Sequence, residues 1–361
     1  MTNERFSARR ALVLLATASA FAILVACNDS VTAPELGAPT SLVSSIVETV
    51  YLPTFDSLNA RAARLSSALD ALAASPSPAA LSAAQDAWRA TREMYERNEG
   101  FAFGPLITNE YDPNMDTWPI DRAGIDALVA GNTSITKAEI DEEDGTLKGF
   151  HGIEYILFGD NNSTTAASLT VGQRNYLSAA GQSLAAVAAA LDEAWSPTGG
   201  NFAGQLTSAG SGNSVYASVG AALQEITSGL IEPTDEVANS KIALPLSSGD
   251  TYFEESAFSD NTLNDLKNDL HGAYAAYTGS FSGDANGIGT LIASQSPSLD
   301  VQVRAQFTAA FAALDAVGPS FDQALHNNPD ALRSAQQAIL TLNHTLVNQV
   351  APLVGAVGDD D

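Results

Sequence analysis

The chain of 361 residues has little cysteine and few basic side chains, and each scarcity excludes a class of protein. Cys27 is the only cysteine, so no intramolecular disulfide can form, and cysteine nucleophiles and thiolate metal sites are excluded. Sixteen basic residues face 42 acidic ones, for a formal net charge of -26. This balance argues against nucleic acid as a partner, because Lys and Arg must neutralise phosphates there. It favours a soluble, exported protein in contact with cations.

Several catalytic signatures are also missing. None of the four histidines lies four residues from another, so the His-Glu-x-x-His zinc signature of metalloproteases is absent. There is no Gly-x-Ser-x-Gly nucleophile elbow and no phosphate-binding loop ending in Gly-Lys-Ser/Thr. No long stretch alternates polar and apolar residues with a period of two, so strands are expected to be minor.

The first 27 residues are typical of a lipoprotein signal peptide. A basic start precedes an apolar run, residues 11–26, that is shorter than a membrane span of ~20 residues. The run ends in Leu24-Val25-Ala26-Cys27, which resembles a bacterial lipobox, and the alternative is an ordinary secretory signal. We expect Cys27 to be lipidated, residues 28–40 to be a tether, and the protein to be anchored in the bacterial envelope, at the outer membrane or in the periplasm.

Apolar residues at helical spacing predict four main helices in each half of the remaining chain. A stretch rich in Gly, Ser, Thr and Asn, residues 196–214, separates the two sets and predicts domains at residues 41–200 and 201–361. The expected fold is therefore all-α, with two up-down four-helix bundles. The predicted helices are residues 41–74 with a break at Pro53, 79–103, 147–159, 171–195, 215–230, 261–277, 299–325 with an interruption at Gly318, and 330–350.

The stretch Gly149-Phe150-His151-Gly152-Ile153-Glu154 carries the strongest chemical signal. His151 and Glu154 are three residues apart, so a helix places both on one face, which large apolar residues continue. An imidazole and a carboxylate in a core need each other, a metal ion or other polar partners. Gly149 and Gly152 are poor helix formers, which indicates that another backbone or a ligand comes close here.

Four further acidic or basic residues could join this pair. The helix predicted at 79–103 places Arg92 and Glu99 among its apolar positions. Arg92 either pairs with a buried Glu or belongs to a site, and a rigid turn after Glu99 favours a site role for that residue. The long acidic connection that follows contains Asp116 and Asp121. A buried His–Glu hydrogen bond and a metal site both remain open from spacing alone, and mixed His and carboxylate ligation suits iron, zinc or manganese.

The segment Gly149 to Gly159 resembles the Gly-x-His-x-x-Glu signature of the imelysin family. Further segments resemble other parts of that family in the same order, and together they span residues 41–354. These segments are Ala87-Trp88-Arg89 through Pro105, Asp116-Thr117-Trp118-Pro119-Ile120-Asp121, Lys241 to Leu246, Glu254-Glu255-Ser256-Ala257-Phe258-Ser259, and Asn261 to Gly272.

The resemblance implies two helical bundles with a cleft between them, in an envelope protein that is often a lipoprotein linked to iron supply. The metal ligands would be His151 and Glu154, and we expect Glu99, Asp116 and Asp121 to assist them. Arg92, Trp118, Glu255 and Ser256 would be partners in the cleft.

The family takes its name from a peptidase assignment, but a zinc peptidase needs about three protein ligands and a general base, and only two ligands are marked. We therefore expect a protein that binds a divalent or ferric ion, with iron favoured and zinc second, and that works with iron-uptake proteins. The alternatives are a metallopeptidase and a non-metal binding module for a peptide or haem.

Overall fold

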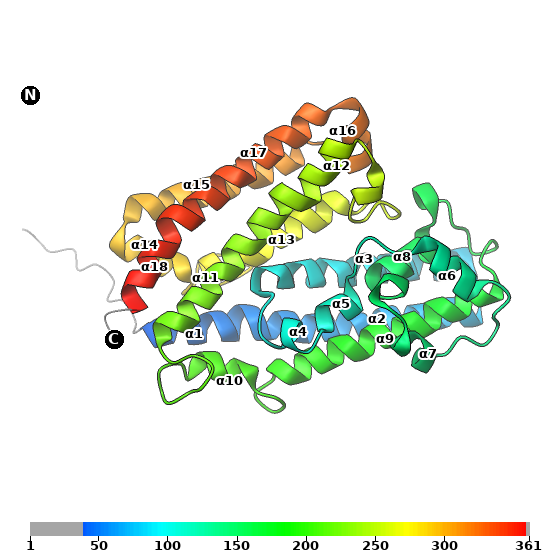
Figure 1. Ribbon diagram of the computed structural model, residues 1–361, viewed down its shortest axis with the longest axis horizontal. Helices are drawn as coiled ribbons and strands as arrows, with labels where there is room; N and C mark the ends of the chain where they lie inside the picture. Colours follow the sequence, from blue (N-terminus) through cyan, green and yellow to red (C-terminus); the bar gives the residue numbers. More distant parts are fainter. Residues whose placement is uncertain (1–38, 359–361) are drawn as a thin grey trace, which may run out of the picture. The chain divides into compact units, whose positions relative to one another are not determined.

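The computed structural model describes residues 39–358, and every regular element in this range is a helix (Figure 1). The expected all-α class is confirmed. The described residues belong to one compact unit. The boundary near residue 200 and the number of bundles stay predictions. Cys27 and nearly all of the expected signal peptide and tether lie outside the described range. Among the residues described, no helix is both long and apolar enough to cross a membrane.

The first half of the chain is organised by α2, which packs along both α3 and α9 (Figure 1). Trp88 of α3 and Trp195 of α9 are fully buried in this core. The helix predicted at residues 171–195 has the same bounds in the structure. The main elements are α1 Pro39–Ile46, α2 Leu52–Ala74, α3 Pro78–Asn98, α8 Gly149–Phe158 and α9 Val171–Trp195. The shorter ones are η2 Glu99–Phe101, α4 Pro105–Thr108, α5 Tyr111–Met115, α6 Arg122–Val129, α7 Lys137–Glu142, η3 Gly145–Leu147, η4 Asp160–Asn162 and α10 Phe202–Thr207.

The second half contains a further set of helices, in which α15 packs against α17 and α11 packs against α13. The expected interruption at Gly318 is present, since α15 ends before it and α16 begins after it. The sequence analysis missed α14. The elements are α11 Val219–Glu236, α12 Ala243–Ser248, η6 Thr251–Phe253, α13 Thr262–Thr278, α14 Ile288–Gln295, α15 Pro297–Asp315, α16 Phe321–Asn327, α17 Pro329–Thr345 and α18 Ala351–Gly358.

Three turns of π-helix interrupt long helices between residues 39 and 358, and each lies just before a proline. They are η1 Val47–Tyr51 before Pro53, η5 Val237–Ile242 before Pro245, and η7 Leu346–Val350 before Pro352. Proline has no N–H and its ring crowds the carbonyl four residues earlier, so the α-helical bond there is lost. A wider turn accommodates this, as the bond from the N–H of Leu52 to the carbonyl of Val47 shows. The break expected at Pro53 therefore takes the form of a π turn.

Glycines let four elements from the two halves of the chain cross in pairs at short range. A Cβ on Gly272 of α13 would lie 2.1 Å from the carbonyl oxygen of Arg97 in α3, and one on Gly229 of α11 would lie 2.4 Å from that of Gly100 in η2. No larger residue fits at either contact. This crossing sets the polar faces of α3 and α13 against each other.

Candidate metal centre

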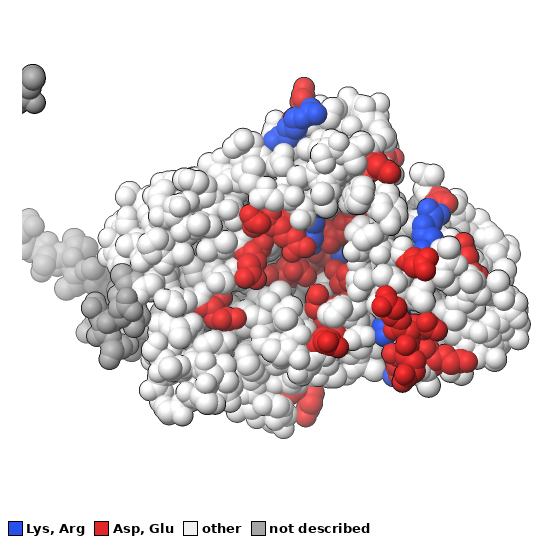
Figure 2. Space-filling model, viewed as in Figure 1, with Lys and Arg blue, Asp and Glu red and all other residues white. Residues whose placement is uncertain are grey.

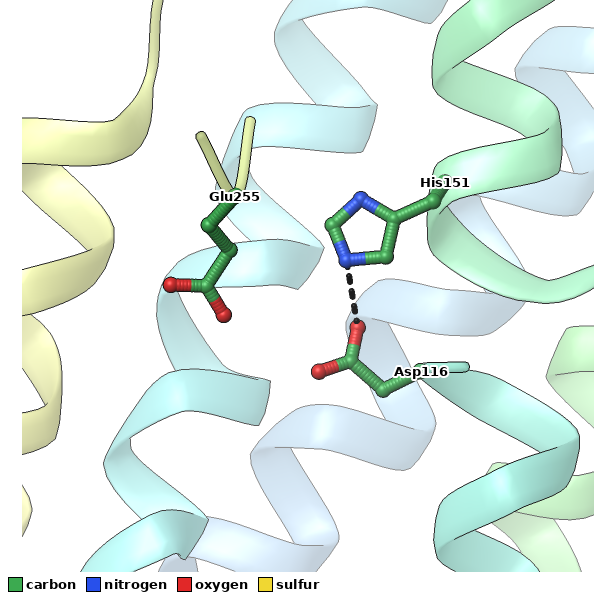
Figure 3. A group of neighbouring side chains, drawn as sticks. All are labelled: Asp116, His151 and Glu255. Atoms are coloured by element: carbon green, nitrogen blue, oxygen red, sulfur yellow. Dashed lines mark ion pairs between the residues drawn. The ribbon is translucent and has the colours of Figure 1, made fainter. Parts of the chain in front are cut away.

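His151 is held in one orientation by Glu154, one helical turn away on α8. Both side chains are buried. The His151 Nδ1 lies 3.1 Å from Glu154 Oε2, and Ser259 donates to Glu154 Oε1 from its backbone N–H at 2.8 Å and its hydroxyl at 2.7 Å. A carboxylate on one ring nitrogen is the arrangement that orients metal-binding histidines and leaves the other nitrogen available. Here His151 Nε2 lies 3.2 Å from Asp116 Oδ1 (Figure 3).

The two glycines of the motif bring Asp116 to this place. Gly149 has φ of +72°, and a Cβ on it would lie 2.3 Å from the carbonyl oxygen of Met115. A Cβ on Gly152 would lie 2.3 Å from the hydroxyl of Tyr176, which donates to the carbonyl of Leu147 at 2.8 Å. The close approach predicted at these glycines is confirmed, and protein atoms make it. Because Met115 lies against Gly149, the next residue, Asp116, faces His151.

Arg92 is fully buried and joins Asp116 to two glutamates. Its guanidinium contacts Asp116, lies 2.5 Å from Glu96 and donates to Glu255 at 3.0 Å. The expected buried Arg–Glu pair is therefore present, with Glu96 and Glu255 as partners. Burial acts to raise the pKa of Asp116, but Arg92 and His151 outweigh it and lower that pKa to about 2.

The pKa of His151 is shifted upward by the same cluster. Burial and the nearby Arg92 favour the neutral imidazole, yet Asp116 and the hydrogen bonds to Asp116 and Glu154 raise the pKa of His151 to about 9. The imidazolium is therefore the stable form near neutral pH when only protein groups are present. A metal ion would have to displace its proton.

Lys241, from the π turn η5, supplies the second cation of the cluster. Its Nζ lies 2.8 Å from Glu255, 3.0 Å from Asp269 and 3.2 Å from Glu96. Burial, the largest influence, raises the pKa of Glu255 to about 7 and that of Asp269 well above its usual range, although Lys241 acts to lower both. Lys241 does not compensate all the carboxyl groups around it.

Two sets of ligand atoms in the described residues lie close enough to share one ion, each within 4.8 Å of the others. One set is Asp116, His151 and Glu255, whose side chains point toward one another in Figure 3. The other is Glu96, Glu255 and Asp269, and Lys241 already lies among these three.

The first set fits a metal ion. One imidazole nitrogen and two carboxylates suit iron, zinc or manganese. Glu255 Oε2 is buried and has no hydrogen-bond partner, so one of these oxygens is unused. Ion binding also requires the guanidinium of Arg92 to withdraw from Asp116 and Glu255, because it contacts both.

The other predicted site residues lie as follows. Glu99 lines the adjoining pocket but belongs to neither ligand set. Asp121 is exposed, and its carboxylate accepts from the N–H of Gly124 at 2.9 Å, which caps α6. The ring of Trp118 lies 4.7 Å from that of His151. Ser256 is buried, and its backbone N–H donates to Thr262.

The sequence analysis missed Glu96, Lys241, Asp265 and Asp269 as members of the cluster. A signal existed for three of them. Glu96 lies four residues after Arg92, and Asp265 and Asp269 are four residues apart, so each spacing places charges on one helical face. Lys241 had no such signal, because its partners Glu96 and Asp269 are 145 and 28 residues away.

A pocket of about 510 Å³ opens beside the cluster, between residues 99–119 and 232–255 of the two halves of the chain. Figure 2 shows acidic side chains gathered around this hollow. Six carboxyl groups line it: Glu99, Asp112, Asp116, Glu232, Glu236 and Glu255.

Comparison with known proteins gives a consistent result. The family model for imelysin matches residues 51–349. Iron-regulated protein A of Synechococcus elongatus is 35% identical over 319 residues, which is 86% of each chain.

Two solved structures share the fold. One, from Parabacteroides distasonis, is described as an iron-regulated protein A precursor, with a TM-score of 0.80, 24% identity, and coverage of 91% of this chain and 96% of that one. The other is an imelysin-like protein from Psychrobacter arcticum, with a TM-score of 0.71, 14% identity and coverage of 88% and 95%.

Proposed function

The chain belongs to the imelysin family, and from this membership and the geometry around His151 we propose that it binds one metal ion, with iron favoured, and serves iron acquisition. The name of its relative, Iron-regulated protein A, supports a link with iron. We further propose that lipidated Cys27 anchors the protein in the bacterial envelope, where iron-uptake proteins are its partners. Zinc is the second candidate ion.

The ligands in this proposal are His151 Nε2 and the carboxylates of Asp116 and Glu255. Glu154 is the positioning residue, because Ser259 and the imidazole already occupy its oxygens. Arg92 and Lys241 leave part of the negative charge of the buried carboxylates uncompensated, and a bound cation would stabilise that charge.

The observation that carries the proposal is the excess of buried carboxyl groups around His151. Arg92 and Lys241 are the two fixed cations that contact this cluster. Five carboxyl groups contact one or both of them, so three lack a compensating charge when all are ionised and His151 is neutral, as metal binding requires. These five are Glu96, Asp116, Glu255, Asp265 and Asp269.

Thermal melting with iron, with zinc and with a chelator tests metal binding. An ion that binds only the folded protein stabilises it by ~2.7 kcal/mol at a hundred times its Kd, so the wild-type Tm should rise with the ion. His151→Ala should remove this rise, whereas His344→Ala, at an exposed histidine outside the cluster, should keep it.

Two other outcomes would contradict the proposal. If His151→Ala lowers the Tm equally with and without ion, only a buried hydrogen bond was lost. If neither iron nor zinc changes the Tm of the wild type, the metal hypothesis is wrong. A chelator-sensitive protease assay tests the metallopeptidase alternative, and a haem titration followed by absorbance tests the binding-module alternative.

A further inference from the structure

The outer part of the 510 Å³ pocket holds three carboxyl groups, and Lys241, which contacts Glu96, Glu255 and Asp269, is in the described range the one cationic residue that lines the same pocket. Glu99 comes from η2, and Glu232 and Glu236 lie one turn apart on α11. Within the described part of the chain, none of the three has a hydrogen-bond or ion-pair partner. Burial raises the pKa of Glu99 and of Glu232 and Glu236 adds to both, although Lys241 acts to lower the pKa of Glu99. Three acidic groups that oppose one another around one space favour a positively charged occupant.

These three carboxylates do not form a site for a bare ion. In the described residues, the sets whose ligand atoms lie close enough to share one ion do not include them. A ligand that contacts all three must therefore be larger than one ion. The pocket volume of about 510 Å³ falls in the range of small-molecule sites.

Apart from the carboxyl groups, Ser240 and Lys241, the walls of the pocket are apolar. Trp118, Pro119 and Pro233 line its interior. At its edge, Ile107, Leu244 and Phe253 keep 51%, 49% and 38% of their surfaces exposed. A hydrated ion gains nothing from such surfaces, whereas a carbon chain or ring does. The aromatic faces of Trp118 and Phe253 can also hold a cationic group.

Glu255, which is also a proposed metal ligand, gives a second indication that a ligand binds at this pocket. It is 94% buried, since its exposed fraction is 6%, and it lines the floor of this pocket. Its Oε1 contacts Arg92 and Lys241, but its Oε2 has no hydrogen-bond partner. A buried carboxylate oxygen left unpaired costs about 1–3 kcal/mol, more when charged, so a donor arriving in the pocket would be favoured.

We propose that this pocket binds a small organic cation, with ammonium or guanidinium groups on an apolar body. The positive groups contact Glu99, Glu232 and Glu236, and the body lies against Trp118 and Phe253. Of the three proposed metal ligands, Asp116 and Glu255 line this pocket and His151 does not, so loss of the His151 side chain removes the metal site without removing a wall of the pocket.

Calorimetry with the full chain at constant ionic strength tests the proposal, with diaminohexane and its uncharged isostere hexanediol as probes. We expect the diamine to bind at least about tenfold more tightly than the diol. The double variant Glu232→Gln/Glu236→Gln should weaken the diamine by about tenfold. The control variant Glu142→Gln/Glu193→Gln changes the net charge equally at two exposed positions outside the pocket, and it should bind the diamine as the wild type does.

Equal binding of diamine and diol by the wild type would overturn the proposal, as would undiminished binding by the Glu232/Glu236 variant. His151→Ala should keep the diamine site, so a failure of the metal proposal is distinguishable from a failure here. A blocked dilysine peptide forms the last arm. If the peptide binds more tightly than the diamine, the natural ligand is a peptide with cationic side chains. If the peptide binds more weakly, the natural ligand is a free amine.

Discussion

At the scale of single residues, Glu154 decides which nitrogen of His151 faces the cluster. In Glu154→Gln the side chain keeps its shape and still accepts from Ser259, but its amide nitrogen then faces His151 Nδ1. The ring would adopt the other tautomer, with its proton on Nε2. We expect metal affinity to fall about 10- to 100-fold, with a smaller loss of folding stability, and metal titration by calorimetry measures it. Unchanged affinity would show that the carboxylate does not orient the ring.

The raised pKa of His151 predicts a pH dependence of stability. A group whose pKa rises on folding contributes stability that is complete below its unfolded pKa and is lost as pH rises through its folded pKa. For His151 that window runs from 6.5 to about 9. Chelator-treated wild type should therefore lose its stability advantage over His151→Ala across this range, measured by urea unfolding at several pH values. An advantage that stays constant between pH 6.5 and 9 would show that the imidazolium is not stabilised.

Metal affinity should change in the opposite sense over the same range. The ion requires the neutral imidazole, so proton loss from His151 favours binding as pH rises toward 9. Titration of the chelator-treated protein with zinc at pH 6, 7 and 8 measures this trend. Affinity that falls with pH would exclude His151 as a ligand.

The sequence predicted some of these residues and not others, for a physical reason. His151, Glu154 and Arg92 were recognisable because helical spacing places each on an apolar face. The set Asp116, His151 and Glu255 combines residues from three separate segments. Spacing along the chain does not report such proximity, so Asp121, in the same loop as Asp116, was an equally good candidate until its role at the end of α6 was visible.

At the scale of elements, the crossing of α3 and α13 brings Arg92 and Glu96 against Asp265 and Asp269. Gly272→Ala should disturb this crossing, because the new Cβ would lie 2.1 Å from the carbonyl oxygen of Arg97 and backbone would have to move. We expect a loss of about 1–3 kcal/mol in the free energy of unfolding, with weaker metal binding. Urea unfolding and metal titration measure the two effects.

Gly355→Ala is the matched control for that crossing. Gly355 lies in α18, and a Cβ there would meet only a side-chain atom of Gln224 at an ordinary 3.6 Å. Alanine favours a helix over glycine, so stability should stay the same or rise by up to ~1 kcal/mol. If both variants behave alike, the close approach of α3 and α13 does not matter to the fold.

At the scale of the whole molecule, apolar periodicity was enough to predict the helical class and most long helices, because burying one face is what stabilises them. The short elements α4, α5, α7, α10 and α14 have four to eight residues, and so few turns give no clear period. The pocket could not be placed from the sequence either. Its walls come from both halves of the chain, so it exists only after they pack together.

The proposed anchor predicts how the whole protein distributes in a cell. Cys27 is the only residue proposed to hold it to the membrane, and no described helix could span one. In Cys27→Ser the protein should move from the membrane fraction to the soluble fraction of the envelope. Because the substitution lies outside the described residues and their metal site, the Tm of the variant and its metal-dependent shift should match those of the wild type. A variant that stays with membranes after a carbonate wash would show that a different anchor holds the protein.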